Sequence, residues 1–164
     1  MGYDLQAVIA PAALLRSVAD PAAGMHVVDL SQGFALMPMT AEFHDRVTVL
    51  DGDSLGFWLL PGDFGATLAD WSRQGPVIYA EADYFGGVGS QSAAVWRDGT
   101  LGFGPVHVPV GEDFPPEGSP ISRALRYAGV DATGHHDEFE AVGLRRHRDN
   151  TAWLEEVGVL PPED

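Results

Sequence analysis

The chain of 164 residues carries a formal net charge of −15, and 45% of its residues are hydrophobic, so we expect one packed globular domain. Such an acidic surface repels nucleic acids and anionic membranes, and it attracts basic proteins or metal cations. The sequence contains neither cysteine nor lysine. This excludes disulfides, thiolate metal sites, cysteine nucleophiles, Schiff-base lysines and a Walker-A lysine.

The amino-terminal segment is predicted to begin with a strand and a helix. Hydrophobic residues at every second position predict the strand over 3–9. Pro11 at the first helical position predicts the helix over 12–18. A further strand is predicted over 25–30, and residues 33–37 either continue this strand or pair with it.

The next segment leads into a second helix. Residues 40–46 fit neither the helical nor the strand pattern clearly, and 47–50 is a short apolar run that can form a strand. The helix is predicted over 62–74, because apolar residues recur there at helical spacing, namely Phe64, Leu68 and Trp71. Gly75-Pro76 ends it.

The stretch 75–100 is the centre of the chain and predicts an antiparallel meander. Residues 77–85 alternate, with Ile78, Ala80, Ala82 and Tyr84 on one face and Tyr79, Glu81, Asp83 and Phe85 on the other. A glycine-rich segment, 86–89, separates this strand from a second one over 91–97. Asp98-Gly99 then predicts a tight hairpin turn before a returning strand over 100–103.

The carboxy-terminal part is predicted to be mainly helical after one more strand over 106–110. Ser119 as N-cap and Pro120 as first residue begin a helix that Gly129 ends. A short helix is predicted over 137–142. Asn150 or Thr151 is expected to cap a last helix, and residues 160–164 are expected to form a loose tail.

These elements predict a single α+β domain over residues 1–164, with helices packed on an antiparallel β-meander. No stretch reaches the roughly 18 apolar residues of a membrane span. The first ten residues lack the basic and apolar regions of a signal peptide. We therefore expect a cytoplasmic protein that does not bind membranes or nucleic acids.

Two segments resemble a family of uncharacterised proteins from actinobacteria and other bacteria. The first runs from Ala80 through Tyr84-Phe85-Gly86-Gly87-Val88-Gly89-Ser90-Gln91 to Trp96, Asp98 and Gly99. The second contains Asp137-Glu138-Phe139, Gly143-Leu144, His147-Arg148 and Trp153-Leu154. Small acidic proteins of this kind are similar to immunity proteins encoded beside secreted toxins. The resemblance implies kinship rather than an activity.

The strand and glycine loop at the centre of the chain supply the candidate binding surface. Aromatic side chains adjoin carboxylates there, which is typical of the anchors of protein interfaces. The residues are Glu81, Asp83, Tyr84, Phe85, Gly86, Gly87, Gly89 and Gln91. With the net charge, they predict a binding protein, such as an immunity protein or inhibitor, that neutralises a basic toxin or enzyme and needs no cofactor.

Two enzymatic alternatives remain. Glu81 and Asp83 project from one face of their strand and, with His26, His135 or His136, can bind a metal ion or perform acid–base chemistry. The sequence Gly52-Asp53-Ser54-Leu55-Gly56 matches the nucleophile elbow of serine hydrolases, which requires a strand before the serine and a helix after it. A turn explains this motif more simply.

Two further motifs have simple structural explanations. The glycines of 86–89 can form an anion-binding nest, but the segment precedes a strand instead of opening a helix, so we expect a hairpin loop or bulge. The basic cluster Arg145-Arg146-His147-Arg148 is expected to pair with carboxylates of the protein itself.

Overall fold

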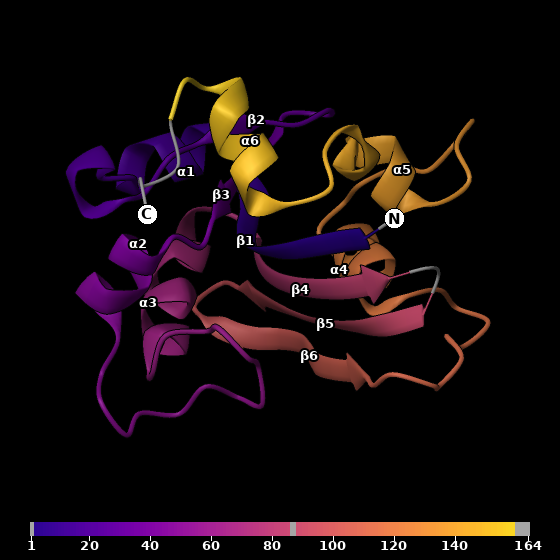
Figure 1. Cartoon of the computed structure of the whole chain (residues 1–164), viewed down its shortest axis with the longest axis horizontal. Helices are drawn as coiled ribbons and strands as arrows, with labels where there is room; N and C mark the ends of the chain where they lie inside the picture. Colours follow the sequence, from indigo (N-terminus) through magenta and orange to yellow (C-terminus); the bar gives the residue numbers. More distant parts are fainter. Residues whose placement is uncertain (1, 86–87, 160–164) are drawn as a thin grey trace.

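The computed structural model describes residues 2–85 and 88–159. They form a single α+β domain, as the sequence predicts, around one antiparallel sheet whose strands lie in the order β2-β3-β1-β4-β5-β6 (Figure 1). The strands are β1 (Gly2–Pro11), β2 (Val28–Asp29), β3 (Phe34–Pro38), β4 (Val77–Phe85), β5 (Val88–Arg97) and β6 (Thr100–Val108). The predicted meander is the part from β4 to β6.

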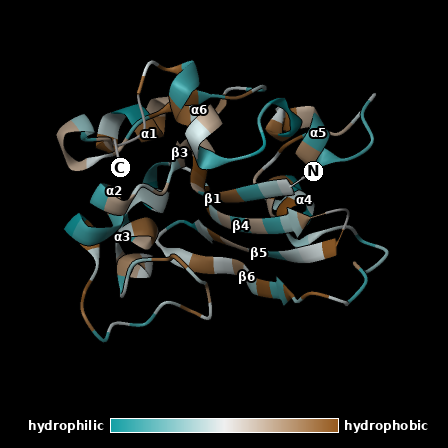
Figure 2. Ribbon diagram, in the orientation of Figure 1, coloured by the Kyte–Doolittle hydropathy of each residue, from teal (hydrophilic) through white to brown (hydrophobic). Residues whose placement is uncertain are grey.

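Helices cover both faces of the sheet. The α-helices are α1 (Ala12–Val18), α2 (Ala41–Val47), α3 (Phe64–Trp71), α4 (Pro120–Tyr127), α5 (Glu138–Val142) and α6 (Asn150–Glu156). Short 3₁₀ turns occur at Pro21–Ala23, Ser72–Gln74 and Leu144–Arg146. Figure 2 shows hydrophilic and hydrophobic residues alternating along the helices, as expected when one side packs on a sheet. Within the described ranges, no helix is long and apolar enough to cross a membrane.

Two hydrophobic cores lie on opposite faces of the sheet. On one face, Leu125, Val142 and Trp153 of α4, α5 and α6 pack on Ile78 and Val95. On the other face, α1, α2 and α3 contribute residues that include Leu15, Phe43 and Leu68. Because both faces of the central strand β1 are covered, every residue from Leu5 to Ala10 is buried.

Several predicted element boundaries are confirmed. Helix α1 spans the predicted 12–18, and β4 spans the predicted 77–85. Ser119 caps α4 by accepting a hydrogen bond from the backbone N–H of Ser122. The turn at Asp98 and Gly99 has φ angles of 54° and 85°, which is the left-handed geometry that the Asp-Gly pair favours.

Other predicted elements are wrong for identifiable reasons. The run 47–50 is not a strand: Val47 ends helix α2, and Val49 and Leu50, which are 52% and 88% exposed, lie in the loop that follows it. The ambiguous segment 40–46 is helical, since Thr40 caps α2. The strand predicted over 25–30 is only Val28–Asp29.

The predicted strands over 100–103 and 106–110 are one continuous edge strand, β6. Irregular register between β5 and β6 accommodates Pro105, which has no N–H to donate. The last helix is capped by Asp149 rather than by Asn150 or Thr151. The expected loose tail over 160–164 lies outside the described residues.

A glycine is required in β5 where the backbone of β4 lies close to Gly89. A Cβ added at Gly89 would collide with the carbonyl oxygen of Asp83. We expect Gly89→Ala to lower the free energy of unfolding by about 2–3 kcal/mol, since backbone atoms rather than a flexible side chain must move.

Gly65 in α3 is the matched control for this substitution, because its added Cβ would lie 3.4 Å from the Trp96 ring, an ordinary contact. We expect Gly65→Ala to leave the protein unchanged or stabilise it by about 0.5 kcal/mol. Urea denaturation of both variants provides the measurement. Equal effects of the two substitutions would contradict the steric explanation.

Candidate functional site

The residues of the predicted binding surface lie at one end of the sheet, but they are divided between its two faces. The register pairs Tyr3 with Tyr84 on one face and Asp4 with Asp83 on the other. Glu81 and Phe85 share the face of Asp83, whereas Gln91 lies on the face of Tyr84. Gly89 belongs to β5, and Gly86 and Gly87 lie outside the described residues.

Glu81 is a buried structural anchor, with only 9% of its surface exposed. Its Oε1 accepts a hydrogen bond from the backbone N–H of Trp58 at 2.8 Å, and its Oε2 accepts one from that of Leu59 at 2.7 Å. The Tyr79 hydroxyl donates a third bond to Oε2 at 2.8 Å. Burial, followed by the Glu81 charge and hydrogen bond, raises the Tyr79 pKa, so this hydroxyl keeps its proton. Glu81 therefore positions the loop over 48–63.

A second anchor holds the same loop from β6. The His107 ring bridges Ser92 Oγ, 2.7 Å from Nδ1, and the Leu55 carbonyl oxygen, 3.0 Å from Nε2. Since a carbonyl can only accept, Nε2 donates its proton to the Leu55 carbonyl oxygen, and the Ser92 hydroxyl is the partner of Nδ1. The Phe57 ring packs edge-on between Tyr79 and His107, with centroid distances of 5.0 Å to each. The loop is thus fixed to the sheet at several points.

The anchored loop presents an exposed tryptophan near the carboxylates of β1 and β4. Trp58 is 72% exposed, and Trp58 and Asp83 both line a small cavity of about 160 Å³. Asp83 lies directly opposite Asp4 on β1, and neither forms an ion pair within residues 2–85 and 88–159, although Asp4 Oδ1 accepts a hydrogen bond from Gln6 Nε2 at 2.6 Å. We call this surface the acidic face and define it by Asp4, Trp58, Asp83, Phe85 and Val88.

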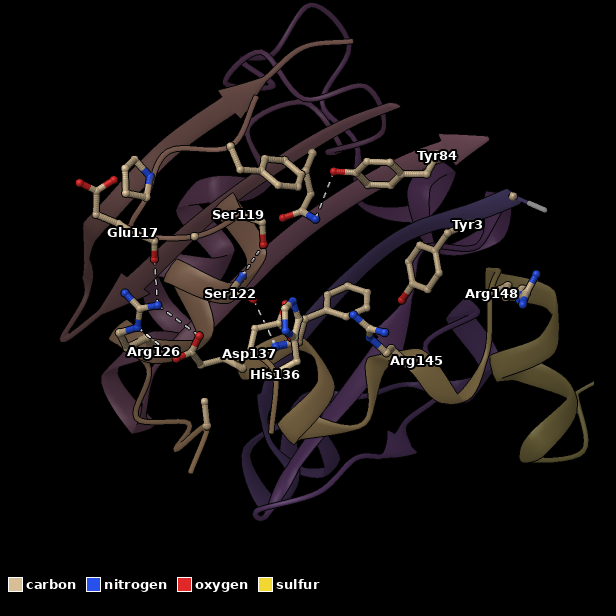
Figure 3. A pocket seen from close by; sticks show the side chains of 18 residues that line it. Tyr3, Tyr84, Glu117, Ser119, Ser122, Arg126, His136, Asp137, Arg145 and Arg148 are labelled. Carbon is tan, nitrogen blue, oxygen red and sulfur yellow. Dashed lines mark hydrogen bonds and ion pairs between the residues drawn. The ribbon is translucent and has the colours of Figure 1, made fainter. Parts of the chain in front are cut away.

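The opposite face of the sheet carries a larger cavity of about 830 Å³, which we call the tyrosine pocket. Figure 3 shows Tyr3 and Tyr84 at one side of it and Glu117 and Arg126 at the other. Burial raises the Tyr84 pKa to about 12, opposed by a hydrogen bond from Gln91, and burial also raises the Tyr3 pKa. Both hydroxyls therefore stay protonated near neutral pH.

The basic cluster behaves only partly as predicted. Arg146 and His147 both bind Glu156, at 2.9 Å in each case. Arg145 and Arg148 are exposed at the rim of the tyrosine pocket, and in the described part of the chain neither forms an ion pair. These two arginines are therefore available to an external anion.

The geometry gives little support to the enzymatic alternatives. No group of three or more His, Asp and Glu side chains within the described ranges is arranged to hold a metal ion. His136 lines the tyrosine pocket, on the opposite face of the sheet from Glu81. Ser54 lies in a loop, and the strand and helix that a nucleophile elbow requires do not flank it.

Comparison of the chain with protein-family models, curated proteins and solved structures finds no match. The resemblance to immunity proteins stays a prediction, and the function has to be inferred from the chemistry of the two surfaces.

Sequence reasoning missed residues that only tertiary contacts bring to these surfaces. Trp58 follows the Gly52–Gly56 motif. The signal available in the sequence was a short apolar segment that contains two aromatic residues and ends at Pro61. Asp4 joins Asp83 through strand register, which the sequence does not specify. Arg148 was expected to pair internally because the overall charge is negative.

Removing the Glu81 charge tests its anchoring role. In Glu81→Gln, an NH₂ group replaces one of the two acceptor oxygens. This donor group then faces the N–H or O–H donors that the oxygen had bound. We expect a loss of about 2–4 kcal/mol in the free energy of unfolding, measured by urea denaturation. Asp83→Asn on the same strand is the exposed control and is expected to change it by less than about 0.5 kcal/mol. An equally small effect of both variants would show that Glu81 is not an anchor.

The Glu138 carboxylate at the far end of the tyrosine pocket predicts a pH dependence. Burial is the largest single influence and opposes its ionisation, but hydrogen bonds from Arg126 at 3.1 and 3.3 Å, a backbone hydrogen bond and the Arg126 charge together lower its pKa. The pKa of Glu138 is lower in the folded than in the unfolded protein. Its ionised carboxylate therefore stabilises the fold at pH values above the unfolded pKa, and this stabilisation is lost as the pH falls through the folded pKa. The stability difference between wild type and Glu138→Gln should therefore shrink from pH 7 to about pH 3. A constant difference in urea denaturation would contradict this.

Proposed function

We propose that the protein is a non-enzymatic binding protein that captures a basic protein partner through its acidic face. The observation that carries the proposal is Trp58, which is 72% exposed and whose own backbone N–H is held by buried Glu81. Tryptophan is enriched among interface hot spots, and a rigid anchor loses little conformational entropy on binding.

The carboxylates of the acidic face, which form no ion pair with the described residues, favour a cationic partner. Asp4 and Asp83 lie directly opposite each other on neighbouring strands, and like charges in that position are destabilising. An arginine or lysine placed between them would relieve the repulsion. The same cation could contact the Trp58 ring through a cation–π interaction.

The surrounding surface suits a protein better than a small cation. Phe85 and Val88 are 78% and 60% exposed at the tip of β4 and β5, so apolar contact area adjoins the charges. The net charge of −15 would also accelerate encounter with a basic surface. An immunity protein or inhibitor that neutralises a basic toxin or enzyme fits this combination.

Affinity capture with tagged protein tests the proposal. We expect the wild type to retain a basic protein from lysate of the source organism at low salt and to release it as salt rises, since screening acts over about 8 Å at physiological ionic strength. With the purified partner, Trp58→Ala should weaken binding by about 2 kcal/mol, or roughly thirtyfold. Asp4→Asn combined with Asp83→Asn should weaken it about tenfold at low salt and less at high salt.

Helix α2 provides the matched control. Glu42→Gln combined with Asp45→Asn changes the charge by the same amount, but α2 lies away from the N-terminal end of β1 (Figure 1). This variant should bind the partner almost as well as the wild type. If it loses as much affinity as the Asp4 and Asp83 double variant, net charge rather than the acidic face governs binding and the proposed surface is wrong.

A further inference from the structure

We propose that the tyrosine pocket is a second binding site, specific for a small anion that carries a planar ring. The site is distinct from the acidic face, because the two surfaces lie on opposite faces of the sheet. Its cavity of about 830 Å³ falls in the range of small-ligand sites, about 300–1,000 Å³.

The positive charge of the pocket is concentrated at one end. Figure 3 shows Arg145 and Arg148 on the Tyr3 side, whereas Glu117 and Arg126 lie on the far side. Arg126 is paired with Glu138, and Asp137 caps α5 by accepting from the Glu140 N–H. Among the arginines that line the pocket, Arg145 and Arg148 are therefore the two that form no ion pair within the described residues. Guanidinium groups bind carboxylate or phosphate oxygens with paired N–H donors.

Aromatic side chains line the same cavity as these arginines. Tyr3 packs against Phe139 with ring centroids 5.3 Å apart, and Tyr84 packs against Phe114 at 6.2 Å. All four rings line the cavity. Rings in such arrangements offer faces and edges for offset or edge-on stacking, so a planar ring is the ligand body that they fit best.

A buried amide supplies a third point of recognition. Gln91 is 5% exposed, and its Oε1 accepts a hydrogen bond from the Ile121 N–H at 2.6 Å. This bond fixes the amide orientation and turns Nε2 toward the pocket, where its contact with the Tyr84 hydroxyl is long, at 3.5 Å. A buried donor with so weak a partner favours an oxygen acceptor on the ligand.

Phenyl phosphate and benzoate are suitable probes, because each joins a ring to one of the two anionic groups. Titrations followed by two-dimensional NMR should show saturable shifts at Tyr3, Gln91 and Arg148 with millimolar or tighter affinity. Benzyl alcohol, which lacks the charge, and inorganic phosphate, which lacks the ring, should bind about tenfold more weakly. The tighter of the two probes identifies the anionic group as phosphate or carboxylate.

Substitutions at the rim and in the pocket locate the site. Arg145→Ala and Arg148→Ala should each weaken probe binding about five- to tenfold, whereas Arg46→Ala on α2 removes the same charge away from the pocket and should have no effect. Gln91→Glu keeps an acceptor for the Ile121 N–H but removes the amide donor, so it should also weaken binding. Melting curves would verify that each variant folds.

The proposal is overturned if neither ringed anion binds, if benzyl alcohol binds equally well, or if the rim substitutions leave the affinity unchanged. Its failure is distinguishable from failure of the acidic face as a protein-binding surface. Trp58→Ala should leave probe binding intact, and Arg148→Ala should leave capture of the basic partner intact.

Discussion

The buried carboxylate of Glu81 is the interaction on which the arrangement of the molecule's acidic surface depends. A carboxylate removed from water is stable only when its oxygens accept enough hydrogen bonds, and Glu81 receives three, from Trp58, Leu59 and Tyr79. Two of these donors belong to the backbone of a loop without helix or strand. The carboxylate therefore supplies the partners that regular secondary structure would otherwise provide, and it determines where the Trp58 side chain emerges.

The pleat of the sheet places acidic and aromatic residues that are neighbours in the sequence on opposite faces. Asp83 and Tyr84 are consecutive residues of β4, yet one lies on the acidic face and the other lines the tyrosine pocket. The helices increase this contrast, because the segment between α5 and α6 places Arg145 and Arg148 on the pocket side only. A protein with a net charge of −15 can in this way hold a local site for an anion. Strand β4 contributes to both surfaces.

Local sequence patterns predicted much of the fold, because strand alternation, helix capping and turn geometry depend on residues that are close together in the chain. Alternation in 77–85 marks β4, Ser119-Pro120 marks the start of α4, and Asp98-Gly99 marks the hairpin turn. The apolar run 47–50 failed as a strand prediction, since hydrophobicity alone does not provide a neighbouring strand to pair with. The residues predicted to form one binding surface lie near one end of β4, but the register divides them between the two faces of the sheet.

The sequence by itself determined the composition of the two surfaces: the excess of carboxylates, the lack of lysine and cysteine, and the carboxylates and aromatic residues of β4. Only the tertiary structure decided which of these residues meet. Strand register brings Asp4 opposite Asp83. Glu81, which the sequence offers as a binding residue, is buried and holds a loop instead. The packing of the helices leaves Arg145 and Arg148 at the rim of a cavity. The physical reason is that register, burial and cavity shape depend on contacts between residues far apart in the chain, which periodicity and spacing along the sequence do not encode.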